Sequence, residues 1–389
     1  MDRAPLPART PIPLVMVKGA YDSAGGPETV LQTIAGNLDR QNFPPLLALL
    51  ARPHETLPPI LADLATRLPT ERIDWRGIAR APVVARRIAA LIAERPGAVL
   101  HTNDMRSDLI AWMVTRVRRV PWIAHVHGWL RHTHSGIHRI YEEIDRRLIP
   151  AADLVLVGST AMAEEVRIAG ARRIDIVTNG IPVSERAPHA EAAAAIRARV
   201  APGGGLIAGV LGRLHPGKGQ ALLIEALAGL RKRGFDITVL LVGVGPAEAE
   251  YRALAARLGV AEHVHFAGLV PDILPWLCAM DMMCVPSLKD SLPLTVMEAM
   301  SVSCPVIASR AGDLPLAIRD GENGLLVEVS SAPALEAAVE RLARDAGLRA
   351  RLGAEGRRTL VEKFSPAAML RQLEGFCATL AAEQAARGR

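Results

Sequence analysis

The segment at residues 212–219, GRLHPGKG, carries residue types suited to holding phosphate. It matches the G-x-x-x-x-G-K pattern of a nucleotide-binding P-loop, but Gly219 stands where such a loop has the Ser or Thr that binds Mg²⁺. Pro216 also removes one backbone N–H group that would contact phosphate. We therefore expect an anion site at a helix N-terminus, where Arg213 and Lys218 supply positive charge without a metal. A surface turn with incidental basic residues is the alternative.

A second candidate anion site lies at residues 287–300, SLKDSLPLTVMEAM. Pro293 suits the first position of a helix, and the backbone N–H groups of Leu294 and Thr295 would then point outward. Asp290 lies in the preceding loop. Glu298 lies a little over one turn inside the helix, where its carboxylate can accept two hydrogen bonds from a vicinal diol such as ribose. The alternative for Glu298 is an ordinary exposed helical residue.

The same succession of strand, glycine-containing loop and helix opens both halves of the chain. In the first half we expect a strand at 14–18, a loop at 25–27 and a helix at about 28–38; in the second, a strand at 206–211 and a helix at 220–233 enclose the GRLHPGKG loop. Further strands are expected at 98–101, 122–125, 154–157, 174–177, 238–242, 264–266, 282–285 and 306–308, and a further amphipathic helix at 78–93.

This alternation predicts an α/β protein of two doubly wound, Rossmann-like domains that face each other across a cleft. The expected boundaries are 1–185 for the first domain, 186–204 for a linker that ends in Gly-rich sequence, and 205–365 for the second domain. Residues 366–389 are expected to form a C-terminal helix that packs back on the first domain. Ligands of such sheets bind beyond the carboxyl ends of the strands.

Composition narrows the class of function. Aromatic residues make up only 3% of the 389 residues and the net charge is +6, which argues against a nucleic-acid partner bound by base stacking. No apolar run reaches the length of a membrane span, and the first residues lack the apolar core of a signal peptide, so we expect a cytoplasmic protein. The cysteines show no metal-binding spacing and are expected to be free buried thiols: Cys278, Cys284, Cys304 and Cys377.

Residues 106–139 hold an excess of five positive charges. The six arginines are either a solvated face or a patch that meets anionic lipid at the inner face of the cell membrane, with three tryptophans as interfacial anchors. They are Arg106, Arg116, Arg118, Arg119, Arg131 and Arg139, with Trp112, Trp122 and Trp129. The same region holds His125, His127, His132, His134 and His138. A zinc site there is conceivable, but no carboxylate or cysteine completes it at motif spacing.

Taken in order, these motifs resemble the retaining GT-B glycosyltransferases of glycosyltransferase family 4. The resemblance rests on the Arg213/Lys218 loop, the Glu-x7-Glu-like element from Asp290 to Glu298, and the segment DGENGLLV at 320–327. It extends to the first half through Gly25-Gly26, His127-Gly128, Ala152-Asp153 and Asn179-Gly180-Ile181. The likeness runs from about residue 14 to residue 364.

The resemblance implies a role for each donor-binding residue. Arg213 and Lys218 would neutralise the diphosphate of a nucleotide-sugar and stabilise the leaving nucleoside diphosphate. Gly26 would let the backbone approach that diphosphate closely, and Glu298 would bind the ribose hydroxyls. Leu294 and Thr295 would contribute their backbone N–H groups.

It also implies which groups surround the transferred sugar. Asp290 would contact the sugar hydroxyls near the reacting carbon, and His127 would line the sugar pocket from the other domain. The family usually has Glu at the position of Asp290 and often Glu at that of Leu316. Its transfer with retention is usually explained by a front-face attack in which the leaving phosphate helps to remove the acceptor proton, so no protein nucleophile, cofactor or metal is required.

The expected activity is therefore metal-independent hexosyl transfer from a UDP- or GDP-linked sugar to a glycan or lipid-linked acceptor, in cell-envelope polysaccharide or glycolipid synthesis. A non-catalytic nucleotide-sugar binding protein and a P-loop NTPase are the alternatives. A dinucleotide-dependent oxidoreductase is less favoured because the first loop lacks G-x-G-x-x-G.

Overall fold

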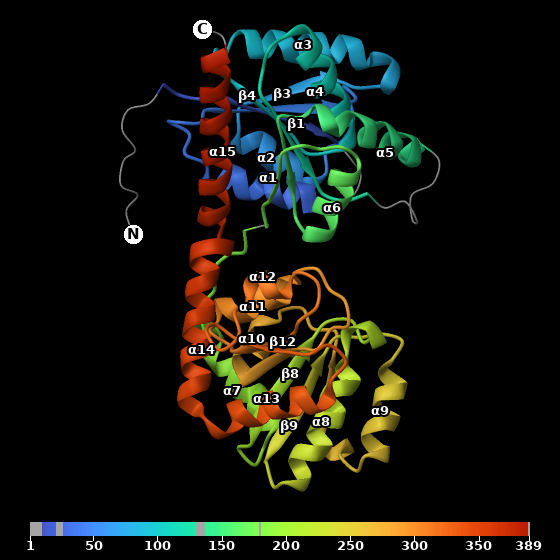
Figure 1. Ribbon diagram of the computed structural model, residues 1–389, viewed down its shortest axis with the longest axis vertical. Coiled ribbons are helices and arrows are strands. Elements are labelled where there is room, and N and C mark those ends of the chain that lie inside the picture. Colours follow the sequence, from blue (N-terminus) through green and yellow to red (C-terminus); the bar gives the residue numbers. More distant parts are fainter. Residues whose placement is uncertain (1–9, 21–25, 130–136, 179, 388–389) are drawn as a thin grey trace. The chain divides into compact units, whose positions relative to one another are not determined.

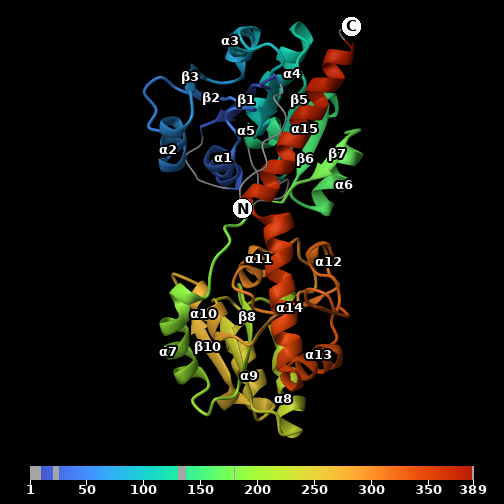
Figure 2. The same ribbon diagram turned by 90° about the vertical axis from the view of Figure 1, so that its left-hand side faces the viewer.

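The chain folds into two compact α/β units. The computed structural model describes residues 10–20, 26–129, 137–178 and 180–387. The first unit comprises the chain up to Gly180 together with Pro366–Arg389, and the second comprises Ile181–Ser365. Each unit contains a sheet of parallel strands with helices on both faces (Figures 1 and 2).

Within the described residues, the first unit has a seven-stranded sheet in the order β3-β2-β1-β4-β5-β6-β7. Its strands are β1 (Leu14–Gly19), β2 (Pro45–Ala51), β3 (Thr70–Asp74), β4 (Val99–Thr102), β5 (Trp122–Val126), β6 (Leu154–Val157) and β7 (Ile174–Ile176). Its helices are α1 (Gly26–Asn37), α2 (Pro59–Arg67), α3 (Ala81–Ala93), α4 (Met105–Val117), α5 (Ile137–Leu148), α6 (Thr160–Ile168) and α15 (Pro366–Arg387).

The second unit has, in the same described part of the chain, a six-stranded sheet in the order β10-β9-β8-β11-β12-β13. Its strands are β8 (Leu206–Leu211), β9 (Ile237–Val242), β10 (Val264–Gly268), β11 (Met282–Val285), β12 (Val306–Ser309) and β13 (Leu325–Val327). Its helices are α7 (Ala190–Val200), α8 (Gln220–Lys232), α9 (Glu248–Arg257), α10 (Leu274–Ala279), α11 (Leu294–Ser301), α12 (Leu314–Ala317), α13 (Ala332–Arg344) and α14 (Ala346–Thr359).

Both sheets reverse their strand order once, and these switch points locate the candidate sites. The reversal lies between β1 and β4 in the first sheet and between β8 and β11 in the second. All pairings within each sheet are parallel, so the loops that follow these strands emerge at the same edge. The α/β class and the two doubly wound sheets are confirmed, whereas the cleft between the units stays a prediction.

Most predicted strands are confirmed to within a residue or two, because strands buried on both faces have apolar sequences such as LVLV in β6. Three strands are not predicted from the sequence. These are β2, whose Leu-Ala sequence has little strand preference, and β3 and β13, which are short and lie at sheet edges.

Residues 186–204 belong to the second unit and are not the expected linker. Helix α7 packs on α10, and its small residues Ala193 and Val200 are buried in the core of this unit. Arg197 fastens the helix with hydrogen bonds to the carbonyl oxygen of Ala279 at 2.7 Å and to the carboxylate of Asp281 at 2.8 Å. The many alanine, glutamate and arginine residues of α7 give no clear apolar face, so its packing could not be predicted from the sequence.

Helix α15 returns to the first unit and completes its core. It lies against α1 and β4. Its inward face carries Met369, Leu370, Leu373, Cys377 and Leu380, all at most 3% exposed, at helical spacing. The helix is also tied by polar contacts, because Glu374 accepts a hydrogen bond from the backbone of Asp39 at 3.0 Å.

Candidate functional site

Two loops of the second unit meet at its switch point, one after β8 and one after β11. The backbone N–H of Leu288 donates to the carbonyl oxygen of Gly217 at 2.9 Å, which joins the loops. Lys218 Nζ lies 2.6 Å from Asp290 Oδ2, and the Ser287 hydroxyl donates to the same carboxylate oxygen at 3.0 Å. The structure therefore brings together Lys218 and Asp290, which the sequence assigned to different parts of the donor.

Gly219 has a steric role that explains the imperfect P-loop pattern. It caps helix α8 in the left-handed conformation, with φ of 71°. A Cβ atom at this position would overlap the carbonyl oxygen of Pro286, in the loop after β11. The close packing of the two loops thus requires glycine where a P-loop has its hydroxyl residue.

The GRLHPGKG loop does not offer its backbone as a phosphate cradle. The N–H of Gly217 donates to His215 Nδ1 at 3.1 Å, and those of Lys218 and Gly219 donate to carbonyl oxygens of their own turn. The expected contribution of this loop is therefore limited to its side chains. Arg213 is exposed and has no ion-pair partner in the described part of the chain, so its guanidinium is available to a ligand.

Helix α11 offers the backbone donors that the first loop lacks. Pro293 is the N-cap, with ψ of 141°, and not the first helical residue as predicted; helix α11 begins at Leu294. Its carbonyl oxygen accepts from the N–H of Val296 at 3.1 Å. Among the described residues, no acceptor contacts the N–H groups of Leu294 and Thr295. The helix thus begins one residue later than expected, and binding of an anion by the N–H groups of Leu294 and Thr295 stays a prediction.

A largely apolar pocket of about 500 Å³ opens beside these groups. It lies at the carboxyl ends of β8 and β9 and contains Leu211, Val242 and Leu269 in its lining, with Arg213 and Thr295 among its polar members. A volume of this size lies within the range of small-molecule sites. The sequence did not predict this pocket, because its lining comes from several separate loops.

Glu298 lies on α11 with its side chain partly buried. Burial raises the pKa of this carboxyl above its ordinary value. Within the described residues, its carboxylate has no hydrogen-bond or ion-pair partner. An acceptor that is partly desolvated and unpaired is suited to two hydroxyl donors of a ligand.

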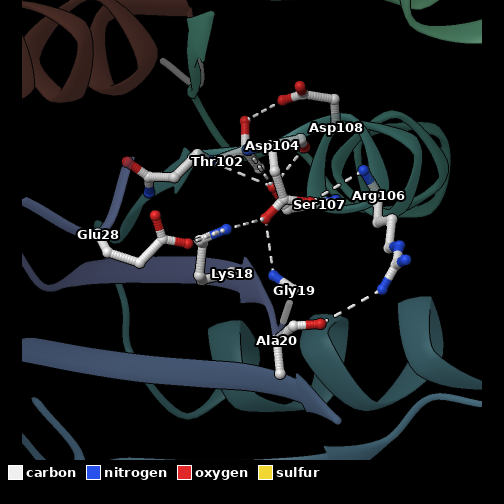
Figure 3. A network of polar contacts seen from close by, with 10 residues as sticks. Lys18, Gly19, Ala20, Glu28, Thr102, Asp104, Arg106, Ser107 and Asp108 are labelled. Carbon is white, nitrogen blue, oxygen red and sulfur yellow. Dashed lines mark hydrogen bonds and ion pairs between the residues drawn. The ribbon is translucent and has the colours of Figure 1, made fainter. Parts of the chain in front are cut away.

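The carboxyl end of the first sheet holds a buried ionic network (Figure 3). Lys18 Nζ lies 3.0 Å from Glu28 Oε1 and 3.4 Å from Asp104 Oδ2. The carboxylate of Asp104 also accepts from the N–H of Gly19 at 2.7 Å and from that of Ser107 at 3.1 Å. Burial alone would raise the pKa of Asp104, but Lys18 and these N–H groups hold it below its ordinary value. Sequence reasoning missed this network.

Gly26 lies in the first turn of α1 and not in the preceding loop, as predicted. The helix starts two residues earlier than expected, and Glu28 in its first turn pairs with Lys18. Gly25 lies outside the described residues.

His127, directly after β5, ends a row of three histidines whose other members are His101 in β4 and His125 in β5. Its ring stacks on that of His125, with centroids 4.3 Å apart, and His125 lies 5.8 Å from His101. Burial lowers the pKa of His101 to about 3 and that of His125 to about 4. The His127 side chain is exposed at one face, yet desolvation by the surrounding protein, then His125 and Lys18, hold its pKa well below the ordinary range. All three rings are therefore neutral at pH 7.

One expectation for the basic segment is changed by the structure, and another lies partly outside the described residues. Trp122 and Trp129 are not interfacial anchors, since they are 0% and 6% exposed and donate to Thr102 Oγ1 and Asp145 Oδ2, both at 2.8 Å. The expected zinc alternative involves His132 and His134, which lie outside the described residues, as does Arg131. In the described part of the chain no cluster of His, Cys, Asp or Glu could hold a metal, and no helix there is long and apolar enough to cross a membrane.

The segment DGENGLLV supports the fold. Asn323 accepts from the N–H of Arg319 at 2.6 Å and donates to the carbonyl oxygen of Ala317 at 2.9 Å, while Asp320 accepts from the N–H of Leu326 at 3.0 Å. These bonds fix the turn before β13. Leu316, on α12, is exposed. The four cysteines are buried free thiols, as predicted.

Comparison with known proteins gives two family matches. Residues 24–185 match the model described as Glycosyltransferase Family 4, and residues 205–345 match the one described as Glycosyl transferases group 1. The D-inositol 3-phosphate glycosyltransferase of Streptomyces bingchenggensis is 30% identical over 334 residues, covering 77% of this chain and 72% of that protein.

Two further proteins are informative. The GDP-mannose-dependent alpha-(1-6)-phosphatidylinositol monomannoside mannosyltransferase of Mycolicibacterium smegmatis is 34% identical over 194 residues, covering 48% of this chain and 51% of that protein. The crystal structure of HepE from Anabaena in complex with UDP superposes with a TM-score of 0.70 at 20% identity, covering 95% of this chain and 100% of that one. This last likeness shows a shared GT-B fold.

Proposed function

This chain belongs to glycosyltransferase family 4, and we propose that it is a retaining, metal-independent enzyme that transfers a hexosyl group from a UDP- or GDP-linked sugar. The observation that carries the proposal is the apolar pocket of the second unit, whose lining includes both Arg213 and Thr295. A nucleobase suits the apolar lining, and the diphosphate that follows it suits the cation and the helix N-terminus.

In this proposal the donor lies along the switch point of the second sheet. Glu298 accepts hydrogen bonds from the two ribose hydroxyls. Arg213, Lys218 and the N–H groups of Leu294 and Thr295 hold the diphosphate. Their charge stabilises the leaving nucleoside diphosphate as it forms, which lowers the barrier of the transfer step.

The ion pair between Lys218 and Asp290 gives donor binding a further effect. A diphosphate competes with Asp290 for the Lys218 ammonium, since both are anions that seek the same donor. When Lys218 turns to the phosphate, the Asp290 carboxylate keeps its bond from Ser287 and gains a free acceptor position. Asp290 is then able to accept from hydroxyls of the transferred sugar, so the sugar contact forms only when the diphosphate is in place.

The first unit is proposed to act through His127. Because its pKa is held well below the ordinary range, the ring is neutral at pH 7 and can form hydrogen bonds with the sugar without adding a charge. We propose a front-face transfer in which the leaving phosphate oxygen takes the acceptor proton. No protein nucleophile, metal or cofactor takes part in this scheme.

The proposed acceptor is a glycan or lipid-linked saccharide of the cell envelope, reached from the cytoplasmic face by peripheral contact with anionic membrane. The similar proteins include one that depends on GDP-mannose and one crystallised with UDP, so both nucleotides remain candidates. A non-catalytic nucleotide-sugar binding protein would bind the donor in the same pocket without transfer.

Calorimetric titration with UDP, GDP, ADP and their hexose conjugates, in EDTA and then in Mg²⁺, tests the proposal. We expect one nucleoside diphosphate to bind in EDTA, and NMR of the product to show the anomeric configuration of the donor. Binding only with Mg²⁺ would favour the P-loop NTPase alternative, an inverted product would exclude retention, and binding without turnover would indicate the non-catalytic alternative.

A further inference from the structure

Besides the pocket of the second unit, the structure contains a cavity in the first unit. It lies at the amino ends of the central strands, whereas His127 lies at their carboxyl ends. Its volume is about 930 Å³. Its lining includes Gly97, Val120 and Asp153, which precede β4, β5 and β6 respectively, whereas His127 follows β5. Because these strands are parallel, the two features lie at opposite edges. The end of α4 and the last turns of α15 supply the rest of the cavity wall.

Four arginines line this cavity against two acids, Asp153 and Glu383. The arginines are Arg116, Arg118, Arg119 and Arg387, and each is exposed. Among the described residues, none of the four has an ion-pair partner. Arg116 lies over the Trp112 ring at 4.8 Å from its centroid, which orients the guanidinium while leaving its charge uncompensated.

Both acids of the cavity are already engaged. Asp153 accepts a hydrogen bond from the backbone N–H of Trp122 at 2.9 Å, and Glu383 is paired with Arg173 at 2.9 Å. Because no described arginine of the lining pairs with either acid, the lining keeps a formal charge of +2 that a ligand can offset. Gathering four like charges at one cavity is unfavourable unless a ligand or counterions offset them.

The rim of the cavity is held in place by a bond between distant segments. The side-chain amide of Gln384, on α15, donates to the backbone carbonyl of Arg119 at 2.8 Å. This contact ties the segment that carries Arg119 to the helix that carries Arg387. Several guanidinium groups around one cavity are suited to the tetrahedral oxygens of phosphate.

We propose that this arginine cavity binds a phosphate-bearing ligand. The ligand chemistry is a phosphomonoester or diphosphate, carried either by the headgroup of an anionic lipid or by a small soluble molecule. Val117 lies between the arginines and is 74% exposed, which suits a lipid surface beside the headgroup. The inference goes beyond the transfer reaction, because no residue of the cavity belongs to the donor site.

The test uses the full chain in an Arg213→Ala/Lys218→Ala background, which removes the cations of the donor site. One arm measures co-sedimentation with vesicles of phosphatidylcholine alone and of equal parts phosphatidylcholine and phosphatidylglycerol. The other arm titrates inorganic pyrophosphate by calorimetry. Binding to the anionic vesicles alone identifies the lipid source, and binding of pyrophosphate identifies the soluble source.

Arg118→Gln and Arg119→Gln should each weaken whichever binding is found by about fivefold, since each basic group near an anionic surface contributes about that factor. The matched control is Arg86→Gln, an exposed arginine of α3 in the same unit and outside the cavity, which should leave binding unchanged. Glu383→Gln should strengthen binding, because it removes a negative charge from the cavity. Circular dichroism checks that each variant is folded.

Two results would overturn the proposal. One is the absence of binding in both arms with the parent protein. The other is an equal loss in the control and in the cavity variants, which would attribute binding to the general charge of the surface.

Discussion

The two sheets of this molecule both place a lysine against an aspartate where their strand order reverses, but in different surroundings. In the first unit, Lys18 lies 3.4 Å from Asp104, and the side chains are 1% and 7% exposed. In the second unit, Lys218 lies 2.6 Å from Asp290, and the corresponding values are 36% and 11%. The same two residue types at equivalent places of the fold thus differ mainly in their access to solvent.

The difference in solvent access indicates that the Lys18–Asp104 pair is structural, whereas a ligand can open the Lys218–Asp290 pair. Lys18 also contacts Glu28, and Asp104 also accepts from backbone N–H groups, so breaking the buried pair leaves charges without water. Among the residues that the structure describes, Lys218 has a single carboxylate partner, Asp290, and its ammonium is exposed enough to be solvated when that pair opens. We infer that the first pair fixes the loops after β1 and β4, and that the second is the part of the molecule that responds to the donor.

The largest expected effect comes from Lys18→Met. Removing the ammonium leaves Glu28 and Asp104 buried without their cation, and breaking a buried pair in this way costs about 3–5 kcal/mol. Denaturant unfolding should show this loss, while Lys218→Met should change stability by no more than about 1 kcal/mol because its pair is partly exposed. Equal losses in the two variants would erase the distinction between the pairs.

A second test uses pH to sharpen the contrast. The pKa of His101 is about 3 in the folded protein against an ordinary 6.5, so this ring contributes stability above pH 6.5 that is lost as pH falls toward 3. His101→Gln removes that loss. Relative to the parent protein, the variant should therefore gain about 2–3 kcal/mol of unfolding free energy on going from neutral pH to about pH 4.5. A difference that stays constant across this range would show that folding does not lower the pKa of His101.

Lys218→Ala tests whether the exposed pair responds to ligand. A hydrogen bond to a charged group contributes about 1.5–3 kcal/mol, so nucleoside diphosphate affinity should fall roughly 10- to 150-fold. Lys289→Ala is the matched control, since Lys289 is exposed in the neighbouring loop and has no ion-pair partner in the described part of the chain. Calorimetry measures both. Unchanged affinity in a folded Lys218→Ala protein would remove the diphosphate assignment.

The smallest expected effect is that of Asp290→Glu, which restores the acid usual in the family. Gly312, with φ of 50°, packs directly on the carbonyl of Asp290, and the N–H of Asp313 donates to that carbonyl at 3.2 Å. The loop has little room to retreat, so the added methylene should intrude on the donor. Overpacking typically costs about 1–3 kcal/mol, or roughly 5- to 150-fold in kcat/KM. A gain in kcat/KM on the native donor would contradict this fitted pocket.

The sequence predicted those features of the fold that have a local cause. The strand β11 and the helix α8 follow from apolar runs and helical spacing. The edge strand β3, TERID, gives no such signal, because an edge strand lacks the second buried face. Helix α7 was assigned to a linker because its sequence is rich in alanine. Buried alanines such as Ala193 give only a weak apolar pattern.

For the site, the sequence predicted which residues could bind a ligand, but it did not predict which of them contact each other. Charge and helix position pointed to Arg213, Lys218 and Asp290, yet the bond between the last two depends on a crossover between β8 and β11. The need for glycine at 219 arises from a carbonyl oxygen at Pro286. From the sequence, Lys18 is only the last residue of a predicted apolar strand. Its partner Asp104 is distant in the sequence, so their contact could not be predicted. Such contacts are set by tertiary structure alone.

Helix α15 has a consequence for the order of biosynthesis. The residues that cover the apolar face beside α1 and β4 follow the second unit in the chain, whereas the strands of the first unit precede it. Until the whole second unit has been translated, the first unit lacks this helix. Residues such as Val30 and Ile34, which share a core with Leu370 of α15, are incompletely buried during that time. A nascent chain that stops before Pro366 leaves this apolar face exposed, so the first unit can complete its core only after the second unit has been made.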